Sequence, residues 1–264
     1  MIIIGELINS TRVPIKKAIE EKNVSYIQDI ARKQAESGVD YIDVNAGAFV
    51  YEEVERLVWL TETVQEAVDK PLALDSPRAE ALKEALKVHR GTPLINSITA
   101  EKERYEAIVP LVKKYNARVL ALCMGDAGMP ETAAERLDVA RQLMADLERD
   151  GVAPENIFFD PLIKPISVDG AFAFQALETI AGIAGWNKGV HITCGLSNIS
   201  FGLPHRGLLN RAFLVMAMER GLDSALVDPL DREMIKLIKA SEVLLNRDAY
   251  GAEYLKASRA GLLD

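Results

Sequence analysis

Short polar side chains follow an apolar run near the end of this sequence. In "HITCGLSNIS" (residues 191–200) a β-branched run breaks at Gly195, and Ser197, Asn198 and Ser200 come directly after it. A strand that only fills a core has no use for such groups at its end, because a buried polar group costs free energy unless it is hydrogen-bonded. The stretch therefore indicates a site at which these side chains bind a ligand.

Other apolar runs of the chain end in a similar way. Their end groups are Glu6 and Asn9, Asp43 and Asn45, Asp75 and Ser76, Asn96 and Ser97, the trio Met124, Gly125 and Asp126, then Asp160, and finally Asp228. The set contains no lysine, so Schiff-base chemistry is not expected. Some members are expected to cap helices, and Ser76 before Pro77 is the clearest of them. Caps alone do not explain an aspartate that closes "LALD", "FFD" or "LVD".

Carboxylates and amides of this kind suit a neutral, flat heterocycle that carries N–H donors. A carboxylate accepts two parallel hydrogen bonds from an amino-pyrimidine edge such as that of a pterin, and an amide both donates and accepts. A hard cation held by the aspartates is an open alternative. A tightly bound metal is not expected, because hydrolytic metal sites usually combine several histidines with carboxylates.

The three histidines do not form such a cluster. His89 is expected at the solvated end of a helix, and His191, which opens a strand, is expected to be structural. His205 lies in a loop and could face a ligand, but one loop histidine is a weak signal.

The elements that must position these side chains alternate regularly. Apolar, β-branched runs predict strands at residues 1–7, 40–46, 70–76, 92–98, 117–124, 156–162, 189–196 and 224–230. Segments with helical spacing of apolar residues separate them. Thr132 and Glu135 predict a capping box at one helix start, and glycines such as Gly38 and Gly151 mark helix ends.

Alternation of strands and helices predicts a parallel sheet with helical crossovers. Eight units in one domain spanning 1–264 predict an α/β fold of the TIM (β/α)8 barrel type. An open doubly wound sheet is the alternative, but no glycine-rich fingerprint follows the first strand. The tail 246–264 is expected to form a last helix over the barrel wall. Catalytic groups of such barrels lie at the carboxyl ends of the strands.

Composition narrows the possible partners. The net charge of −8 argues against nucleic acid and against an anionic membrane surface as a partner. No run is long enough to predict a membrane span, and the first residues lack the basic segment of a secretion signal. Two cysteines, Cys123 and Cys194, support neither a disulfide framework nor a metal cluster. The sequence therefore predicts a cytoplasmic protein.

The motifs "GELIN", "YIDVNAG", "LALDS", "LINSI", "FFDPL" and "GLSNIS" follow in this order over almost the whole chain. This ordered set resembles the pterin-binding methyltransferase family. That family includes methyltetrahydrofolate:corrinoid/iron–sulfur protein methyltransferases and the tetrahydrofolate methyltransferase components of corrinoid O-demethylase and glycine betaine systems. The folate module of cobalamin-dependent methionine synthase and dihydropteroate synthase are more distant relatives. The resemblance implies a TIM barrel that forms a homodimer.

The resemblance also implies a reaction and a site. The expected enzyme moves a methyl group between the cobalt of a partner's methylcobalamin and N5 of tetrahydrofolate, giving or consuming 5-methyltetrahydrofolate. Asp75, Asn96 and Asp160 are implied to hold the pterin ring, and Asn198 is implied to lie near N5 as the catalytic group. The remaining residues expected at the pterin are Glu6, Asp43, Asn45 and Ser197.

The cobalamin is expected to belong to a transiently bound corrinoid protein. The chain has no Asp-x-His-x-x-Gly stretch that could supply a histidine ligand to cobalt. Glycine-rich loops at 123–130 and 200–207 are the candidates for contact with the corrinoid. The residues expected to face it are Met124, Gly125, Asp126, Phe201 and Arg206. Two alternatives stay open: a dihydropteroate synthase-like enzyme, and a folate-binding barrel without catalysis.

Overall fold

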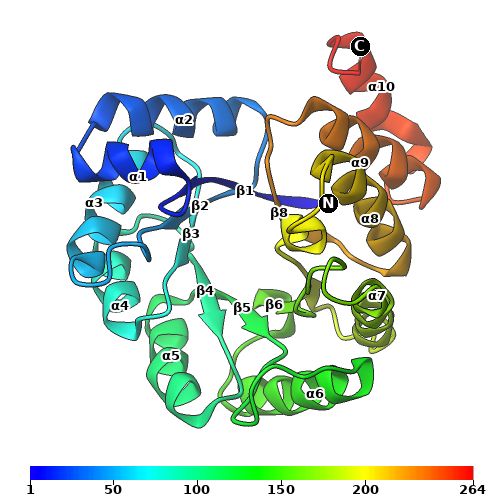
Figure 1. Ribbon diagram of the computed structural model, residues 1–264, viewed down its shortest axis with the longest axis horizontal. Coiled ribbons are helices and arrows are strands. Elements are labelled where there is room, and N and C mark those ends of the chain that lie inside the picture. The colour runs from blue at the N-terminus through cyan, green and yellow to red at the C-terminus, as the bar shows by residue number, and fades with distance from the viewer. Residues whose placement is uncertain (264) are drawn as a thin grey trace.

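The computed structural model describes residues 1–263, and its centre is a ring of eight parallel strands (Figure 1). The strands are β1 (Ile2–Asn9), β2 (Tyr41–Asn45), β3 (Leu72–Asp75), β4 (Leu94–Ile98), β5 (Arg118–Leu122), β6 (Ile157–Asp160), β7 (His191–Ile192) and β8 (Ser224–Val227). From β1 to β7 each strand pairs with the next, and β1 also pairs with β8. The predicted number and order of strands are therefore confirmed.

The sheet closes between β7 and β8. Gly195 and Leu226 form an isolated parallel bridge, and the backbone N–H of Leu226 donates to the carbonyl of Cys194 at 2.9 Å. The pairing of β8 with β1 on its other side completes the circle. The fold is thus a TIM barrel, and the open doubly wound sheet is excluded.

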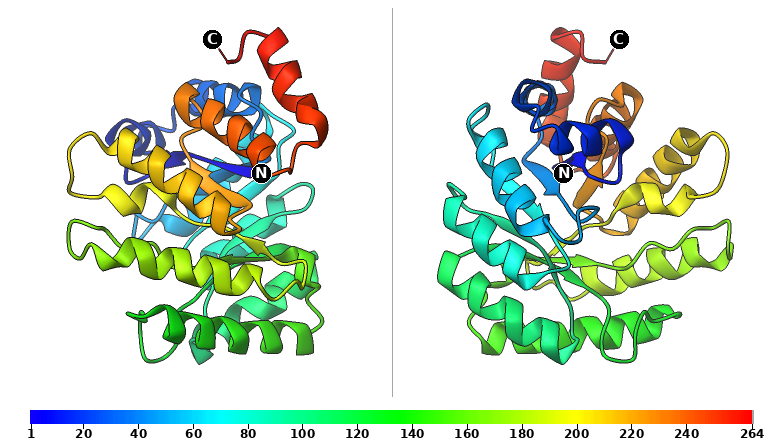
Figure 2. Two further views of the ribbon diagram at one scale, coloured as in Figure 1. Left: turned by 90° about the vertical axis from the view of Figure 1, so that its right-hand side faces the viewer. Right: turned by 60° about the vertical axis from the view of Figure 1, so that its left-hand side comes forward.

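Helices surround the strands in all views (Figures 1 and 2). They are α1 (Val13–Glu20), α2 (Val24–Glu36), α3 (Glu53–Gln65), α4 (Ala79–Val88), α5 (Lys102–Tyr115), α6 (Ala133–Arg149), α7 (Ala171–Ala184), α8 (Arg206–Arg220), α9 (Arg232–Leu244) and α10 (Ala252–Arg259). The capping box of Thr132 and Glu135 is present at the start of α6. Gly151 follows that helix with a φ of 84°, a conformation that glycine adopts without a Cβ clash. Within residues 1–263, no helix combines the length and hydropathy that a membrane span needs.

Two separate apolar layers support the barrel. The larger one fills the space between the strands and the helices. The smaller one lies inside the barrel and is built by Ile4, Tyr41, Ala73, Leu94, Leu120 and Phe158. This inner layer is formed by side chains of alternate strand residues, because successive strand residues point to opposite faces of a sheet. It forms the floor beneath the polar side chains at the strand ends.

Strand seven is much shorter than predicted. Residues 189–196 were expected to be extended, but only His191 and Ile192 form the strand. The chain turns at Gly195 and enters a 3-10 helix, η2 (Leu196–Ser200). Ser197, Asn198 and Ser200 therefore lie on a short helical turn above the strand.

The C-terminal segment differs from its prediction as well. A short 3-10 turn, η3 (Ala249–Gly251), leads into α10, whose only buried residue is Ala257. Figures 1 and 2 show α10 standing out from the ring of helices instead of lying along the wall. The expectation of a wall-covering helix is wrong in this respect. Of the range 246–264, Asp264 lies outside the described residues.

Candidate active site

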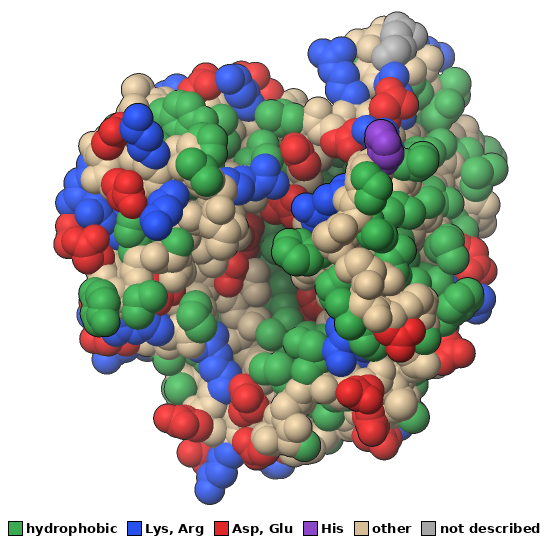
Figure 3. Space-filling view, in the orientation of Figure 1, with side chains coloured by type: hydrophobic (Ala, Val, Ile, Leu, Met, Phe, Trp, Pro, Cys, Tyr) green, Lys and Arg blue, Asp and Glu red, His purple; other side chains and the backbone are tan. Residues whose placement is uncertain are grey.

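The carboxyl ends of β1 to β4 bring four predicted residues to one level of the barrel. Asn9 pairs with Asn45, Asn45 with Asp75, and Asp75 with Asn96. Asp43 lies two residues before Asn45 and so points to the same side of β2. Figure 3, which looks into this mouth, shows a central hollow with acidic side chains inside it.

Hydrogen bonds hold these side chains in pairs. The amide of Asn45 donates to Asp75 Oδ2 at 2.8 Å, and its carbonyl accepts from Ser10 Oγ at 2.9 Å. The amide of Asn96 donates to Asp43 Oδ1 at 3.2 Å. Each amide therefore orients a carboxylate on a neighbouring part of the sheet and leaves other carboxylate oxygens available to a ligand.

Asp160 closes the site from the other side. Its side chain is only 8% exposed, and its Oδ1 accepts from the backbone N–H of Leu162 at 2.7 Å. The backbone N–H of Gly195 also lies near this carboxylate and lowers its pKa. The charge of Arg136 of α6 also acts on it, and this wholly buried side chain has three guanidinium nitrogens without a hydrogen-bond partner within residues 1–263.

Burial changes the acidity of the three aspartates. It raises the pKa of Asp160 to about 6, against the N–H groups of Leu162 and Gly195 and the charge of Arg136. It raises the pKa of Asp75 to about 6 as well, where the amide of Asn45 and the charge of Arg104 oppose the rise and Glu53 adds to it. The pKa of Asp43 is raised well above its usual value, by burial first and then by the charge of Asp75. Strongly perturbed acids in a hollow are typical of functional sites.

Ser197 and Asn198 come from η2, above the short seventh strand. Asn198 is exposed, and its backbone N–H donates to the carbonyl of Gly195 at 3.2 Å. Its amide lies close to Gly195: a Cβ on that glycine would be 3.2 Å from Asn198 Nδ2. Because the N–H of Gly195 also lies near Asp160, this glycine stands between the exposed amide and the buried carboxylate.

Glu6 lies at the mouth beside charged groups from three other segments. Arg12 donates to Glu6 Oε1 at 3.1 Å. Burial raises the pKa of Glu6, and the charges of Arg12 and Arg206 lower it while Asp228 raises it. Glu6 and Arg206, which are far apart in the sequence, therefore face the same hollow.

The residues expected to face a corrinoid occupy two loops of the rim. Asp126 and Phe201 are exposed, Met124 is half-buried, and Gly125 is buried. The carboxylate of Asp126 accepts from the N–H of Lys102, the first residue of α5. This bond gives Asp126 a structural role in addition to the one predicted for it.

Arg206 ties the second of these loops together. Its guanidinium donates to the carbonyl of Ser197 at 2.6 Å and to Ser200 Oγ at 3.1 Å, and it lies 5.8 Å from the centre of the Phe201 ring. Ser167 Oγ donates to the carbonyl of Phe201 at 2.7 Å. The loops after β6 and β7 are thereby joined beside Asn198.

The rim also carries an apolar surface that the sequence did not reveal. Its exposed side chains are Val13, Val50, Tyr51, Met129, Val168, Phe174, Phe201, Leu208 and Leu230. All of them lie in the loops after the strands or in the first turn of the next helix. Figure 3 shows hydrophobic side chains around the central hollow. Exposed apolar groups gathered around a polar hollow are typical of a surface that binds another molecule.

Two expectations about individual polar residues need correction. Ser76 does not cap α4; it is buried, and its Oγ donates to Glu53 Oε1 at 2.6 Å while accepting from the N–H of Arg78. His89 ends α4 as expected, but it is not solvated, because its Nε2 accepts from the N–H of Leu72 at 3.1 Å. Burial accordingly lowers the pKa of His89 to about 4.

The other two histidines lie where the sequence placed them. His191 Nδ1 lies 2.7 Å from Asp223 Oδ2 at the base of the barrel, in agreement with a structural role. His205 is exposed in the loop before α8. Among residues 1–263, no group of three or more His, Cys, Asp or Glu side chains is arranged to hold a metal ion.

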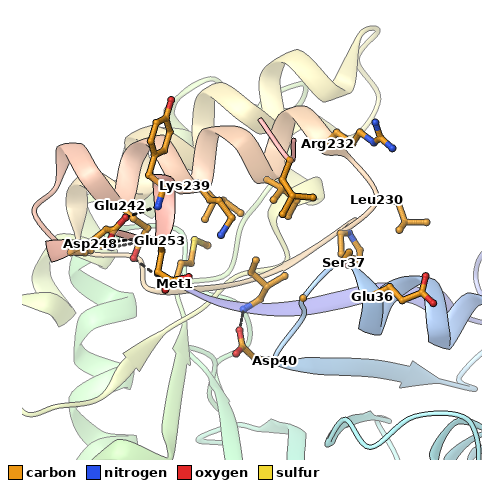
Figure 4. A pocket seen from close by; sticks show the side chains of 18 of the residues that line it. Met1, Glu36, Ser37, Asp40, Leu230, Arg232, Lys239, Glu242, Asp248 and Glu253 are labelled. Carbon is orange, nitrogen blue, oxygen red and sulfur yellow. Dashed lines mark hydrogen bonds and ion pairs between the residues drawn. The ribbon is translucent and has the colours of Figure 1, made fainter. Parts of the chain in front are cut away.

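A cavity of about 750 Å³ lies on the flank of the barrel, between the start of β1, the end of α2 and helices α9 and α10. Figure 4 shows its charged side chains, several of which bind one another. The amino group of Met1 donates to Glu242 at 3.0 Å, and Asp40 accepts from the N–H of Ile3 at 2.7 Å. The carboxylates of the mouth do not line this cavity, so it is separate from the candidate site.

Relatives of known function cover nearly all of the chain. A methylcorrinoid:tetrahydrofolate methyltransferase of Eubacterium limosum is 38% identical over 99% of this chain and 97% of its own length. Methionine synthase of Mycobacterium tuberculosis is 29% identical over 86% of this chain, which spans only 20% of that longer protein.

Solved structures show the same architecture at lower identity. Dihydropteroate synthase of Xanthomonas albilineans with 4-aminobenzoic acid matches with a TM-score of 0.69 and 19% identity, over 94% of this chain and 92% of its own. The Yersinia pestis enzyme with a pterin–sulfa conjugate matches with a TM-score of 0.67 and 18% identity, over 93% and 94%. These two likenesses concern the fold alone. The family model described as pterin binding enzyme matches residues 5–228. The chain therefore belongs to the pterin-binding enzyme family.

Proposed function

We propose that this protein is a methyltransferase that moves a methyl group between the corrinoid of a partner protein and N5 of tetrahydrofolate. The observation that carries the proposal is the 38% identity, over nearly the full length of both chains, to a methylcorrinoid:tetrahydrofolate methyltransferase. The strand-end carboxylates and amides at the barrel mouth supply a site of the required chemistry.

The aspartates and amides at the strand ends suit the pterin ring. Asp75 and Asn96 are neighbours across β3 and β4, and Asp160 faces the hollow from β6. An ionised carboxylate accepts both N–H groups of an amino-pyrimidine edge, and the amide of Asn96 reads an adjacent ring oxygen or nitrogen. The apolar floor formed by Leu120 and Phe158 supports a flat ring beneath these groups. Glu6, Asp43, Asn45 and Ser197 complete the proposed pocket.

Asn198 is the proposed catalytic residue. When the methyl group leaves N5, negative charge develops on this nitrogen and a hydrogen-bond donor stabilises it; when N5 accepts the methyl group, its lone pair must be free. Within residues 1–263 the exposed side-chain amide of Asn198 makes no hydrogen bond, so it can donate to N5 or turn away without breaking one. Orientation of the two substrates supplies much of the remaining rate. The partner's corrinoid donates or accepts the methyl group.

The apolar rim supports docking of a partner protein. Met129, Phe201 and Leu208 are exposed around the hollow, and aromatic residues and methionine are enriched in protein interfaces. A partner seated there would bring its corrinoid to the open face of the proposed pterin pocket and cover it from water. Met124, Gly125, Asp126 and Arg206 lie in the loops that such a partner would meet.

Dihydropteroate synthase chemistry has less support. The two dihydropteroate synthase structures described above are 19% and 18% identical to this chain, whereas the relative that matches it over nearly its full length at 38% identity is a methyltransferase. The buried, unpaired cysteines Cys123 and Cys194 agree with the prediction of a reducing, cytoplasmic setting. The homodimer stays a prediction that rests on the resemblance.

Turnover with free methylcobalamin and tetrahydrofolate tests the proposal. The absorption band of the cobalt centre should change only when protein and tetrahydrofolate are both present, and Asn198→Ala should slow the change. Tight binding of tetrahydrofolate without turnover, even with a methylated corrinoid protein, would instead indicate a non-catalytic folate-binding barrel.

A further inference from the structure

Arg104 joins the two strand ends that the proposed pterin pocket depends on. It is the third residue of α5, and its guanidinium is half-buried behind the ends of β3 and β4. Its Nη2 donates to the carbonyls of Ser76 at 2.9 Å and Ser97 at 2.6 Å. Its Nε donates to Ser97 at 3.0 Å, and its Nη1 donates to the carbonyl of Pro77 at 2.6 Å.

The accepting carbonyls have a defined place in the site. Ser76 and Pro77 directly follow Asp75, and Ser97 directly follows Asn96. The N–H of Ser76 also donates to the carbonyl of Asn96 at 3.1 Å. One rigid fork of donors therefore fixes how far apart the two ring-binding residues stand, although Arg104 itself touches neither side chain.

The charge of Arg104 acts on the same carboxylate. Asp75 is surrounded by Asn45 and Asp43 on β2, by Glu53 on α3 and by Arg104 on α5. Glu53 is 2% exposed and bonded to Ser76, and its charge opposes the ionisation of Asp75. Arg104 is the one cation in this group, and it favours the ionised form that accepts two hydrogen bonds.

We infer that Arg104 is a positioning residue of the pterin pocket: it clamps the ends of β3 and β4 so that Asp75 and Asn96 meet the ring together. The inference rests on the proposed function, because it takes these two residues to hold the pterin. Lysine cannot replace this clamp, since an ammonium group is a point charge without the planar fork. It can replace the positive charge.

Arg247 provides a matched control. It lies at the opposite end of the barrel, where its guanidinium donates to the carbonyls of Leu222 and Met218 at 2.8 Å each and lies 3.7 Å from Glu242 Oε1. Arg247→Met removes the same kind of bonds to backbone carbonyls, together with this ion pair, and leaves the mouth unchanged. A general loss of stability affects both arginine variants, whereas a loss of folate affinity is expected only at Arg104.

The experiment is a calorimetric titration of tetrahydrofolate into wild type, Arg104→Met, Arg104→Lys and Arg247→Met between pH 5 and 8. Arg104→Met should bind about tenfold more weakly or worse, the equivalent of one lost ligand hydrogen bond. The pH at which it loses affinity should also move upward. Arg104→Lys should bind more weakly than wild type but lose affinity at the wild-type pH. Wild-type affinity in Arg104→Lys would overturn the clamp, and this variant decides the matter if Arg104→Met does not fold.

Hydrogen exchange separates this inference from the proposed function. In Arg104→Met without ligand, the amides of Ser76, Arg78 and Ala79 and those of residues 97–100 should exchange faster than in wild type and in Arg247→Met. Unchanged exchange in both segments would contradict the clamp. Failure of wild type to bind tetrahydrofolate would contradict the proposed function, and the exchange comparison would still decide whether Arg104 joins the strand ends.

Discussion

Carboxylates at the two ends of this barrel have different surroundings. At the base, Asp223 is partly exposed, lies 2.7 Å from His191 Nδ1 and accepts from the N–H of Ile192. At the mouth, Asp43 and Asp160 are 1% and 8% exposed; Asp43 accepts from the side-chain amide of Asn96, and Asp160 accepts from the backbone N–H of Leu162. Neither of the two takes part in an ion pair with another of residues 1–263.

This difference separates groups that stabilise the fold from groups that are kept for a ligand. At the base, Asp223 and His191 satisfy each other's hydrogen bonding, so mutation of either residue should affect only the stability of the fold. Buried carboxylates with unused acceptor oxygens destabilise the ligand-free protein. A protein retains such groups where the N–H donors of a bound ligand complete their hydrogen bonding. The following predictions test this contrast, beginning with the largest effect.

Asn198→Ala should reduce the rate of methyl transfer at saturating substrates by about 100-fold or more, because it removes a donor aimed at the developing charge on N5. Affinity for tetrahydrofolate should fall less than the rate. Single-turnover kinetics with methylcobalamin separate the two effects. A variant that transfers methyl at the wild-type rate once saturated would remove Asn198 from the mechanism.

Asp160→Ala should weaken tetrahydrofolate binding by roughly 1–3 kcal/mol, because it leaves ring donors unpaired in a buried site. Asp223→Ala at the base is the control: it should lower the melting temperature and leave the affinity unchanged. Calorimetry on both variants gives the comparison. Equal losses of affinity at the two ends would show that the mouth has no special role.

Asp75→Asn should stabilise the ligand-free protein at neutral pH. Burial raises the pKa of Asp75 from 3.8 to about 6, so ionisation opposes folding above about pH 6 and ceases to do so near pH 4. Asparagine keeps an oxygen for the amide of Asn45 and removes the charge. The free energy of unfolding should rise by roughly 1–2 kcal/mol at pH 7.5, and the gain should vanish near pH 4. Urea unfolding at both pH values measures this change in the free energy of unfolding. A loss of stability at pH 7.5 would contradict the view that the mouth carboxylates destabilise the ligand-free protein.

Gly195→Ala should have the smallest effect. The φ of −72° accepts alanine, but the new Cβ would lie 3.2 Å from Asn198 Nδ2 and push the amide aside. A small displacement of a catalytic group should slow methyl transfer roughly threefold to tenfold. Gly170→Ala, in open space at the start of α7, is the control and should not change the rate. Equal rates in both variants would show that the position of Asn198 is not critical.

Much of this fold could be predicted from the sequence because its signals are local and repeated. Eight β-branched runs, each followed by a helical pattern, determine the barrel, and Thr132 with Glu135 marks the start of α6 as observed. The boundaries of β7 could not be predicted, since an apolar run alone does not show that Gly195 starts a helical turn. The position of α10 depends on tertiary contacts that periodicity does not report.

The parts of the site that consist of a single polar residue at the end of a strand could be predicted from the sequence. Asp75 and Asn96 follow directly from register, because carboxyl ends of parallel strands meet at one edge. Ser76 was misassigned because its partner, Glu53, comes from a different helix. The clamp of Arg104 and the apolar rim were missed for the same reason: they arise from residues that only the closed barrel brings together.

The pH dependence of tetrahydrofolate binding tests most directly whether the mouth carboxylates are kept ionised for the ligand. Asp75 and Asp160 both have a pKa raised to about 6, and a carboxyl group offers both oxygens as acceptors to ring N–H donors only when it is ionised. In calorimetric titrations of wild type, the affinity should be constant above about pH 7 and should fall as the pH drops through about 6. An affinity that stays the same from pH 8 to pH 5 would contradict the account.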